Sequence, residues 1–374
     1  MTFFKILHTS KKSKARVGVI QTPHGNITTP NFVAVGTNGT LKALDNVLLD
    51  QLGQELIFCN TYHLFLQPGT HVIKQAGGLH SFIKRKGPII TDSGGFQIFS
   101  LAYGSVASEL KSKGQKQQNK TLLKVTEEGA TFRSYIDGKT IFLSPEISVQ
   151  AQKDLGADII IPLDELPPYH IKGIDLKKAL DRTHRWEQRS LDEHKKDPKG
   201  QHMYAVLHGG MDFDLRQHSL DVLKKLDFDG FSIGGSLGKT KKELFSLLEW
   251  LVPKIPKEKP NHLLGIGDLE SVDFALKHGI DTFDSSYPTR CARHGMLLTK
   301  HAPLKITQGK YKLDFGPIEH DCVCPTCTHY SRAYLHHLFK AKELTSYTLA
   351  TIHNVYFMIH KMKRMQQMIL NDEI

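Results

Sequence analysis

Three aspartates lie at the ends of short apolar segments, where a carboxylate can act as a nucleophile or as a general acid or base. They are Asp92 in "PIITD", Asp164 in "ADIIIPLD" and Asp284 in "DTFD". A single aspartate in such a position is explained equally well as the cap of the next helix or the start of a turn. Three of them favour chemistry, and other apolar segments also end in polar or small residues: Asn60, His208, Gly234, Gly235 and Gly267.

A second group of residues has the spacing of metal ligands. Cys322, Cys324 and Cys327 form a C-x-C-x2-C pattern, and His353 follows them. Three thiolates and one imidazole complete a tetrahedral Zn2+ site, which is structural because no position stays open for water. Unliganded cysteines in a loop are the alternative. Four other histidines compete with His353 for the fourth position: His320, His329, His336 and His337.

The apolar segments alternate with amphipathic stretches such as "SVQAQKDLG" and "KKELFSLLEWLVPK". Strands that are apolar throughout and alternate with helices are typical of parallel strands covered on both faces. We predict an α/β fold, a (β/α)8 TIM barrel, with a doubly wound open sheet as the second choice. In a barrel, the aspartates would share the face on which active sites are built. The predicted strands are 17–20, 32–36, 56–60, 88–92, 157–164, 203–209, 230–235, 262–267 and 281–284.

Composition limits the class of protein. The 374 residues are 40% hydrophobic, and their net charge of +11 favours a polyanionic partner without proving one. No apolar run of about 18 residues is present, so we predict no membrane span. The N-terminus has no pattern of a secretory signal. Of five cysteines, only Cys59 and Cys291 are isolated, and we expect neither to bind metal. This cysteine pattern predicts a reducing, cytoplasmic location.

Two polar stretches remain. Residues 104–129 form a lysine-rich insertion that we expect to include a mobile loop, and a solvated loop without a role is the simpler reading of its tip. Residues 330–344 are predicted to be a helix. Their Tyr, His and Leu side chains could form an exposed contact surface, and ordinary core packing is the alternative.

Longer motifs connect these features to a known family. "TDSGGFQIFSL" at 91–101, "LSPE" at 143–146, "GFSIGG" at 230–235 and "FDSSYPTRCARHG" at 283–295 precede the cysteine cluster in this order. With these motifs, nearly the whole chain resembles the queuine tRNA-ribosyltransferase (tRNA-guanine transglycosylase) family of the bacterial type. The resemblance implies one catalytic barrel domain over 1–374, a zinc-binding subdomain over 317–360 and a homodimer.

The resemblance also implies a reaction. Members exchange the wobble guanine of tRNAs with GUN anticodons, those for Asp, Asn, His and Tyr, for a 7-deazaguanine base, without an organic cofactor. Asp284 matches the family's nucleophile, which holds the ribose as a covalent ribosyl-aspartate. Asp92 matches the general acid/base. Elementary chemistry agrees, because a carboxylate can attack the anomeric carbon while a second acid protonates the departing base, as in retaining glycosidases.

The remaining site residues are carried over in the same way. Asp164 matches the carboxylate that reads the guanine-like edge of the base, whose N–H donors suit such an acceptor. Phe96 matches an aromatic that stacks on the base, and Gly235 a backbone contact to it. Arg290 and Arg293 match arginines that hold the anticodon. Tyr330, Tyr334 and His337 resemble positions at the dimer contact, although core packing would also explain them.

The sequence differs from that of the usual bacterial members at positions that the resemblance places near the base. His208 stands where bacterial members usually have a base-binding glutamine, and Tyr287 replaces an aliphatic residue. "GGSLGKT" and "VTEEG" are closer to the animal type. We therefore hypothesise that the incoming base is queuine, with 7-aminomethyl-7-deazaguanine as the alternative.

Three other functions are alternatives to this one. A non-catalytic tRNA-binding paralogue typically lacks the nucleophile, whereas both Asp284 and Asp92 are present. An unrelated barrel hydrolase with a structural zinc site would act on a small substrate without tRNA. The archaeal-type relative usually carries additional C-terminal RNA-binding domains, for which we expect no room between the cysteine cluster and Ile374.

Overall fold

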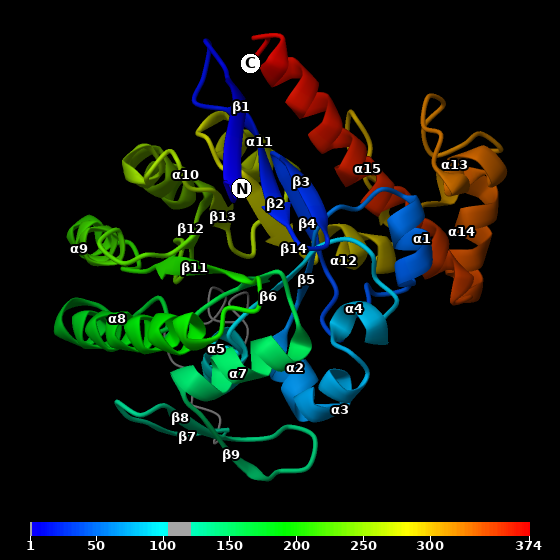
Figure 1. The fold of residues 1–374 in the computed structure, drawn as a ribbon. Coiled ribbons are helices and arrows are strands. Elements are labelled where there is room, and N and C mark those ends of the chain that lie inside the picture. Colours follow the sequence, from blue (N-terminus) through cyan, green and yellow to red (C-terminus); the bar gives the residue numbers. More distant parts are fainter. Residues whose placement is uncertain (1, 104–120) are drawn as a thin grey trace.

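The computed structural model describes residues 2–103 and 121–374, and its centre is a closed barrel (Figure 1). Eight strands close in the order β10-β11-β12-β13-β14-β4-β5-β6, and every neighbouring pair is parallel. Closure confirms the predicted (β/α)8 barrel and excludes the open sheet. The strands are β4 (Asn31–Val35), β5 (Ile57–Cys59), β6 (Ile89–Thr91), β10 (Ile159–Ile160), β11 (His202–Leu207), β12 (Gly230–Ile233), β13 (Asn261–Leu263) and β14 (Thr282–Ser285).

Alternation of apolar residues explains why these segments form a barrel. In β4, Phe32 packs in a core cluster shared with the surrounding helices, while its neighbour Val33 belongs to a second cluster. Ile57 and Phe58 divide in the same way in β5. Strands β4 and β5 are therefore apolar on both faces, because one face meets the helices and the other fills the barrel.

Helices surround the barrel, and several begin at a side chain that caps them. Ser144, Asp212 and Asp268 each accept a backbone hydrogen bond at the start of a helix, and Thr240 forms a capping box with Glu243. No helix in the described part of the chain is long and apolar enough to cross a membrane. The helices are α1 (Asn46–Gln51), α2 (Thr61–Leu66), α3 (Thr70–Gln75), α4 (Leu79–Phe82), α5 (Gly95–Tyr103), α7 (Pro145–Leu155), α8 (Gly173–Lys196), α9 (Phe213–Leu223), α10 (Lys241–Leu251), α11 (Leu269–Lys277), α12 (Tyr287–Arg293), α13 (Pro325–His329), α14 (Arg332–Ala341) and α15 (Thr345–Leu370).

One predicted strand lies outside the barrel. The segment 17–20 is part of β2 (Arg16–Thr22), which pairs antiparallel with β1 (Phe4–Thr9) and β3 (Gly25–Thr29). Ile20 and Ile27 of this sheet pack in the same cluster as Val33 and Phe58. The prediction of a strand is therefore confirmed, while its inclusion among parallel strands is wrong.

Part of the insertion predicted at 104–129 forms a strand. Residues 104–120 of it lie outside the described residues. Residues 122–125 form β7 (Leu122–Val125), which joins β8 (Ala130–Arg133) and β9 (Thr140–Leu143) in an antiparallel sheet. A two-stranded sheet, β15 (Met296–Leu297) and β16 (Leu304–Lys305), and two short 3-10 helices, η1 (Val252–Lys254) and η2 (Gly309–Tyr311), complete the elements.

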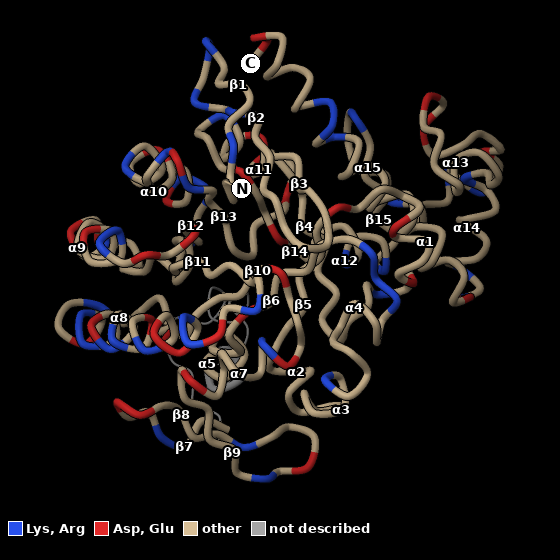
Figure 2. Tube along the Cα trace, viewed as in Figure 1, with Lys and Arg blue, Asp and Glu red and all other residues tan. Residues whose placement is uncertain are grey.

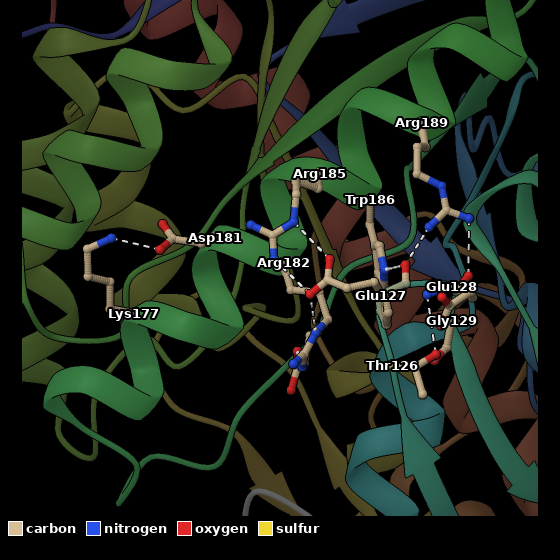
Figure 3. A network of polar contacts seen from close by, with 11 residues as sticks. Thr126, Glu127, Glu128, Gly129, Lys177, Asp181, Arg182, Arg185, Trp186 and Arg189 are labelled. Carbon is tan, nitrogen blue, oxygen red and sulfur yellow. Dashed lines mark hydrogen bonds and ion pairs between the residues drawn. The ribbon is translucent and has the colours of Figure 1, made fainter.

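Arginines of α8 fix the turn between β7 and β8, as Figure 3 shows. Glu127 accepts hydrogen bonds from Arg185 Nε and Nη2, both at 2.8 Å, and from Arg182 Nε at 3.3 Å. Trp186 Nε1 donates to the Glu127 carbonyl at 2.8 Å. Figure 2 shows that basic and acidic residues are interspersed along α8, so this helix can form ion pairs with residues of either charge. The segment "VTEEG", at the end of the predicted insertion, is therefore anchored to α8.

The C-terminal helices form a separate core cluster with the segment after α12. Leu335 and Leu338 of α14 pack there with Leu297, Ile306 and Cys324. Helix α14 confirms the predicted helix at 330–344. Its Tyr334 and His337 are exposed, and Tyr334 stacks on exposed Tyr330, so core packing does not explain these side chains.

Candidate active site

Asp92 lies immediately after β6 and is held by three donors. Thr61 N donates to Oδ1 at 2.7 Å, and Asn60 Nδ2 and Gln97 Nε2 donate to Oδ2 at 2.7 and 3.0 Å. Burial raises the pKa of Asp92 to about 6, although these hydrogen bonds oppose the rise. One of its donors, Thr61 N, belongs to the first residue of α2, so Asp92 also closes the start of that helix. The carboxyl group of Asp92 has an acidity suited to proton transfer near neutral pH.

Asp164 follows β10 and accepts a hydrogen bond on each oxygen. Ser93 Oγ donates to Oδ1 at 3.1 Å, and His208 Nε2 lies 2.8 Å from Oδ2. His208 stands just after the end of β11 and is 4% exposed. Since Ser93 is adjacent to Asp92, two of the predicted carboxylates are connected through neighbouring residues.

Gly235 lies beside His208, at a position that has no room for a side chain. Its φ is +74°, and a Cβ atom there would lie 2.8 Å from His208 Nδ1. A larger residue would both strain the backbone and displace the imidazole. Glycine at this position therefore preserves the approach of the backbone to His208.

A cavity of about 220 Å³ opens next to His208 and Gly235. Its other walls come from the segment after Asp164 and from the start of α8, including Tyr169 and Leu176. Phe96, on α5, is 46% exposed, which is unusual for a phenylalanine and leaves its ring available to a ligand.

Asp284 lies within β14 and is 7% exposed. Its Oδ1 accepts hydrogen bonds from Gly265 N at 2.8 Å and from His262 Nε2 at 3.1 Å. His262 is fully buried in β13, the neighbouring strand. Sequence reasoning did not identify His262, because a histidine inside an apolar strand is most simply explained as part of the core. Only the register, which pairs His262 with Thr282, shows that it lies on the same face as Asp284.

Arg290 and Arg293 lie on α12, which follows β14. Arg290 is exposed, and Arg293 Nη1 donates to the Thr289 carbonyl of its own helix at 3.2 Å. Neither guanidinium forms an ion pair with a carboxylate among the described residues, so both are available to an anion.

Buried Asn354 of α15 fixes the segment that begins with α12. Asn354 Nδ2 donates to the carbonyls of Pro288 and Met296 at 3.0 and 2.9 Å, and its Oδ1 accepts from Leu298 N at 2.8 Å. All the polar atoms of this side chain are used on one segment. Sequence reasoning did not identify Asn354, which is adjacent to the predicted ligand His353.

The predicted metal ligands come together. His353 Nδ1 lies 3.8, 3.5 and 3.4 Å from the Sγ atoms of Cys322, Cys324 and Cys327. His353 Nε2 donates to the Leu298 carbonyl at 2.7 Å, which leaves Nδ1 to face the sulfurs. These four groups could hold a metal ion, and three thiolates with an imidazole are compatible with zinc. The four competing histidines are not part of the cluster.

The isolated cysteines remain outside this cluster. Both Cys59 and Cys291 are free thiols. Burial raises the pKa of Cys59 to about 12, so it stays protonated and is a poor ligand.

A group of two histidines and an aspartate at the start of β10 differs from the cysteine cluster. His24 Nδ1 lies 2.8 Å from Asp158 Oδ1, and the rings of His24 and His80 stack with centroids 3.5 Å apart. Atoms in direct hydrogen-bond contact leave no room between them for an ion. We therefore interpret Asp158 as a hydrogen-bonded structural carboxylate.

The fold and the site together define a class of protein. A closed parallel barrel with carboxylates at the carboxyl ends of its strands has the architecture of a barrel enzyme. The cluster of three cysteines and a histidine near the C-terminus distinguishes it from a bare barrel.

Comparison with known proteins is more specific. The family model for queuine tRNA-ribosyltransferase matches residues 10–374. A queuine tRNA-ribosyltransferase of Protochlamydia amoebophila is 64% identical over 376 residues, which cover 100% of this chain and 97% of that protein. The enzymes of the same name from Chlamydia caviae and Chlamydia trachomatis are each 53% identical over 372 residues, with 99% of both chains covered. The chain belongs to the queuine tRNA-ribosyltransferase family of pentosyltransferases, and the prediction from its motifs is confirmed.

Proposed function

We propose that the chain exchanges the wobble guanine of GUN-anticodon tRNAs for a 7-deazaguanine base. The observation that carries the proposal is the placement of Asp92, Asp164 and Asp284 at the carboxyl ends of three barrel strands. Family membership supports the substrate class. The site would act on tRNAs for Asp, Asn, His and Tyr, and the enzyme would work in the cytoplasm as a homodimer.

In this proposal, Asp284 is the nucleophile and forms a covalent ribosyl-aspartate. Asp92 gives a proton to the departing guanine and later takes one from the incoming base. Its pKa of about 6 supports this double role, because the group can be both protonated and ionised near neutral pH. Two successive displacements return the ribose to its original configuration.

Asp164, His208, Gly235 and Phe96 would bind the base. The carboxylate of Asp164 suits the N1–H and 2-amino donors of a guanine-like ring. His208 holds the Asp164 oxygen at 2.8 Å, so the histidine that replaces the usual glutamine would orient this acceptor. The aromatic ring of Phe96 would stack on the base.

The cavity beside Gly235 supports queuine as the incoming base. Its volume of about 220 Å³ exceeds what a single aminomethyl group needs, and Tyr169 offers a polar group in its wall. The cyclopentenediol of queuine would occupy this space, while 7-aminomethyl-7-deazaguanine is the alternative.

Arg290 and Arg293 would hold the anticodon loop, since both guanidinium groups lack a carboxylate partner among the described residues. The Cys322–Cys324–Cys327–His353 cluster would bind one structural Zn2+ per subunit. We propose that 1–374 is one catalytic domain and that 317–360 is a zinc-binding subdomain within it. Exposed Tyr330 and Tyr334 would contribute to the dimer contact.

Mass spectrometry of nucleosides tests the function and the base together. Unmodified GUN-anticodon tRNA is incubated with the enzyme and either queuine or 7-aminomethyl-7-deazaguanine. We expect queuosine in the first reaction and little product in the second. A clear preference for the aminomethyl base would contradict the queuine assignment, and no exchange with either base or with labelled guanine would contradict the function.

The alternative is a non-catalytic paralogue that binds tRNA. Its support would be tRNA binding without exchange. The presence of both Asp284 and Asp92, each aligned by hydrogen bonds, favours the enzyme.

A further inference from the structure

His262 occupies a position from which it can act on the candidate nucleophile. It lies on β13 opposite Thr282 of β14, and its side chain is fully buried. The ring reaches Thr282 Oγ1 with Nδ1 at 2.8 Å and Asp284 Oδ1 with Nε2 at 3.1 Å. Both of its ring nitrogens therefore have a partner on the strand that carries Asp284.

The hydrogen on Nε2 of His262 can be assigned from its acceptor, Asp284. An ionised carboxylate only accepts, so Nε2 carries a hydrogen and donates to Asp284. The Thr282 hydroxyl lies 2.8 Å from Nδ1 and holds the ring in the orientation that points Nε2 at Asp284. His262 therefore presents an N–H donor to the Asp284 carboxylate.

The two oxygens of Asp284 differ in their surroundings. Oδ1 accepts from both His262 Nε2 and Gly265 N. Among residues 2–103 and 121–374, no donor is bonded to Oδ2. The Asp284 side chain is 10% exposed, so it is accessible from the barrel opening.

We propose that Oδ2 of Asp284 is the atom that attacks the ribose and that His262 is the residue that positions it. The inference rests on the proposed function. With Oδ1 fixed by two donors, rotation of the carboxylate is restricted and Oδ2 points away from them. A donor bound to the attacking oxygen would have to be removed first, and this arrangement avoids that step.

The chemical balance of both half-reactions fits this assignment. In the first, a bond forms between Oδ2 and C1′ of the ribose, the bond from C1′ to the guanine nitrogen breaks, and its electron pair stays on guanine, which takes a proton from Asp92. In the second, the incoming base loses a proton to Asp92 and its nitrogen attacks C1′. The bond from C1′ to Oδ2 then breaks, and its electron pair returns to the carboxylate.

His262 contributes most when Asp284 carries negative charge. In the ribosyl ester, Oδ1 is an uncharged carbonyl oxygen that still accepts both hydrogen bonds. As the ester breaks, charge returns to the carboxylate, and the hydrogen bond from Nε2 strengthens because its acceptor becomes ionised. His262 therefore assists the departure of Asp284 in the second half-reaction as well as its alignment in the first.

The test compares His262→Gln with His262→Leu in steady-state exchange of labelled guanine into tRNA. Glutamine keeps an N–H near the place of Nε2, and leucine removes it. We expect His262→Leu to lower kcat about 10- to 100-fold, with the KM values for tRNA and base changed less than about twofold. His262→Gln is expected to recover most of the loss.

Two further variants keep the test decisive. His336→Leu removes another buried histidine, whose Nδ1 bonds the Ile306 carbonyl far from the site along the chain, and should leave kcat unchanged. Thr282→Val removes the hydroxyl that orients Nδ1 without changing the shape of the residue much. It should lower kcat about two- to fivefold, and it stands in for His262→Leu if that variant does not fold.

Either of two results would overturn the inference. The first is that His262→Leu has the same kcat as the unaltered enzyme. If His262→Leu does not fold, the same result with Thr282→Val counts instead. The other is a loss through KM for tRNA alone, which would indicate a merely structural role. In both cases the unaltered enzyme still exchanges the base, so the proposed function stands, whereas inactivity of the unaltered enzyme would contradict the function itself.

Discussion

Strand β14 has a buried aspartate at each end, and the two have different partners. Asp281, just before the strand, receives Arg16 Nε and Nη2 at 2.9 and 2.6 Å and Asn261 N at 2.8 Å. Asp284, three residues later, receives His262 and a backbone amide on one oxygen, and no Arg or Lys among the described residues pairs with it. One carboxylate is saturated, and the other is aligned with one oxygen free.

The same contrast recurs at β10. Asp158, before the strand, accepts Ile89 N at 2.8 Å and His24 Nδ1 at 2.8 Å, whereas Asp164, after it, contacts His208, which lines the cavity. The function that we propose therefore assigns roles to the aspartates at the carboxyl ends of these strands and none to those at the other end. Only the carboxyl end opens to a ligand, because loops at that end leave the barrel mouth accessible.

The largest expected effect comes from Asp284→Asn. The amide keeps the shape of the side chain but cannot attack the ribose, so exchange should fall by about 10^4-fold. The melting temperature should change little, because no Arg or Lys among the described residues pairs with Asp284. Guanine exchange and calorimetry measure the two effects, and activity near that of the unaltered enzyme would remove the distinction between the two aspartates.

Asp281→Asn should have the opposite result. It leaves the buried Arg16 guanidinium without its counter-charge, which costs about 3–5 kcal/mol of the free energy of unfolding. The folded fraction should retain its kcat. Urea unfolding followed by activity measurements at low temperature provides the check, with Asp284→Asn as the matched control on the same strand.

Asp92→Asn separates catalysis from stability at one residue. Exchange should fall about 100-fold or more because proton transfer is lost. Burial lifts the pKa of Asp92 from 3.8 to about 6, so the folded state binds this proton more tightly than the unfolded chain. The unaltered protein therefore loses about 3 kcal/mol of stability as the pH rises from about 4 to about 6.

The asparagine variant should lack that loss. Its unfolding free energy between pH 4 and pH 7 should fall less than that of the unaltered enzyme, as measured by urea titrations at both values. An identical pH dependence in the two proteins would show that Asp92 is not the buried acid whose ionisation costs stability.

Asn354→Ala extends the comparison to a structural residue outside the barrel strands. The carbonyls of Pro288 and Met296 lose their donor, and the α12 segment with Arg290 and Arg293 loosens. We expect KM for tRNA to rise about five- to tenfold, with KM for the base unchanged and about 1–3 kcal/mol of stability lost. Equal changes in both KM values would argue against a specific effect on α12.

Local pattern was sufficient to predict most elements. The nine predicted strands all exist, because runs such as "IIT" and "YAVL" are apolar enough to be buried on both faces. The assignment of 17–20 to parallel strands failed because an apolar run does not reveal its pairing partner. The sequence did not indicate that the end of the predicted insertion is anchored to α8, because those arginines lie about 60 residues away along the chain.

The sequence by itself determined the barrel class, the family and the identity of the chemically capable residues. Spacing placed three thiols within six residues, and motif order carried the family. Only the tertiary structure decided which histidine joins the thiols, that His208 contacts Asp164, and that His262 and Gly265 share one oxygen of Asp284. The physical reason is that apolar periodicity is local, whereas a hydrogen-bond partner is chosen by the register of neighbouring strands and by the burial that the whole barrel creates.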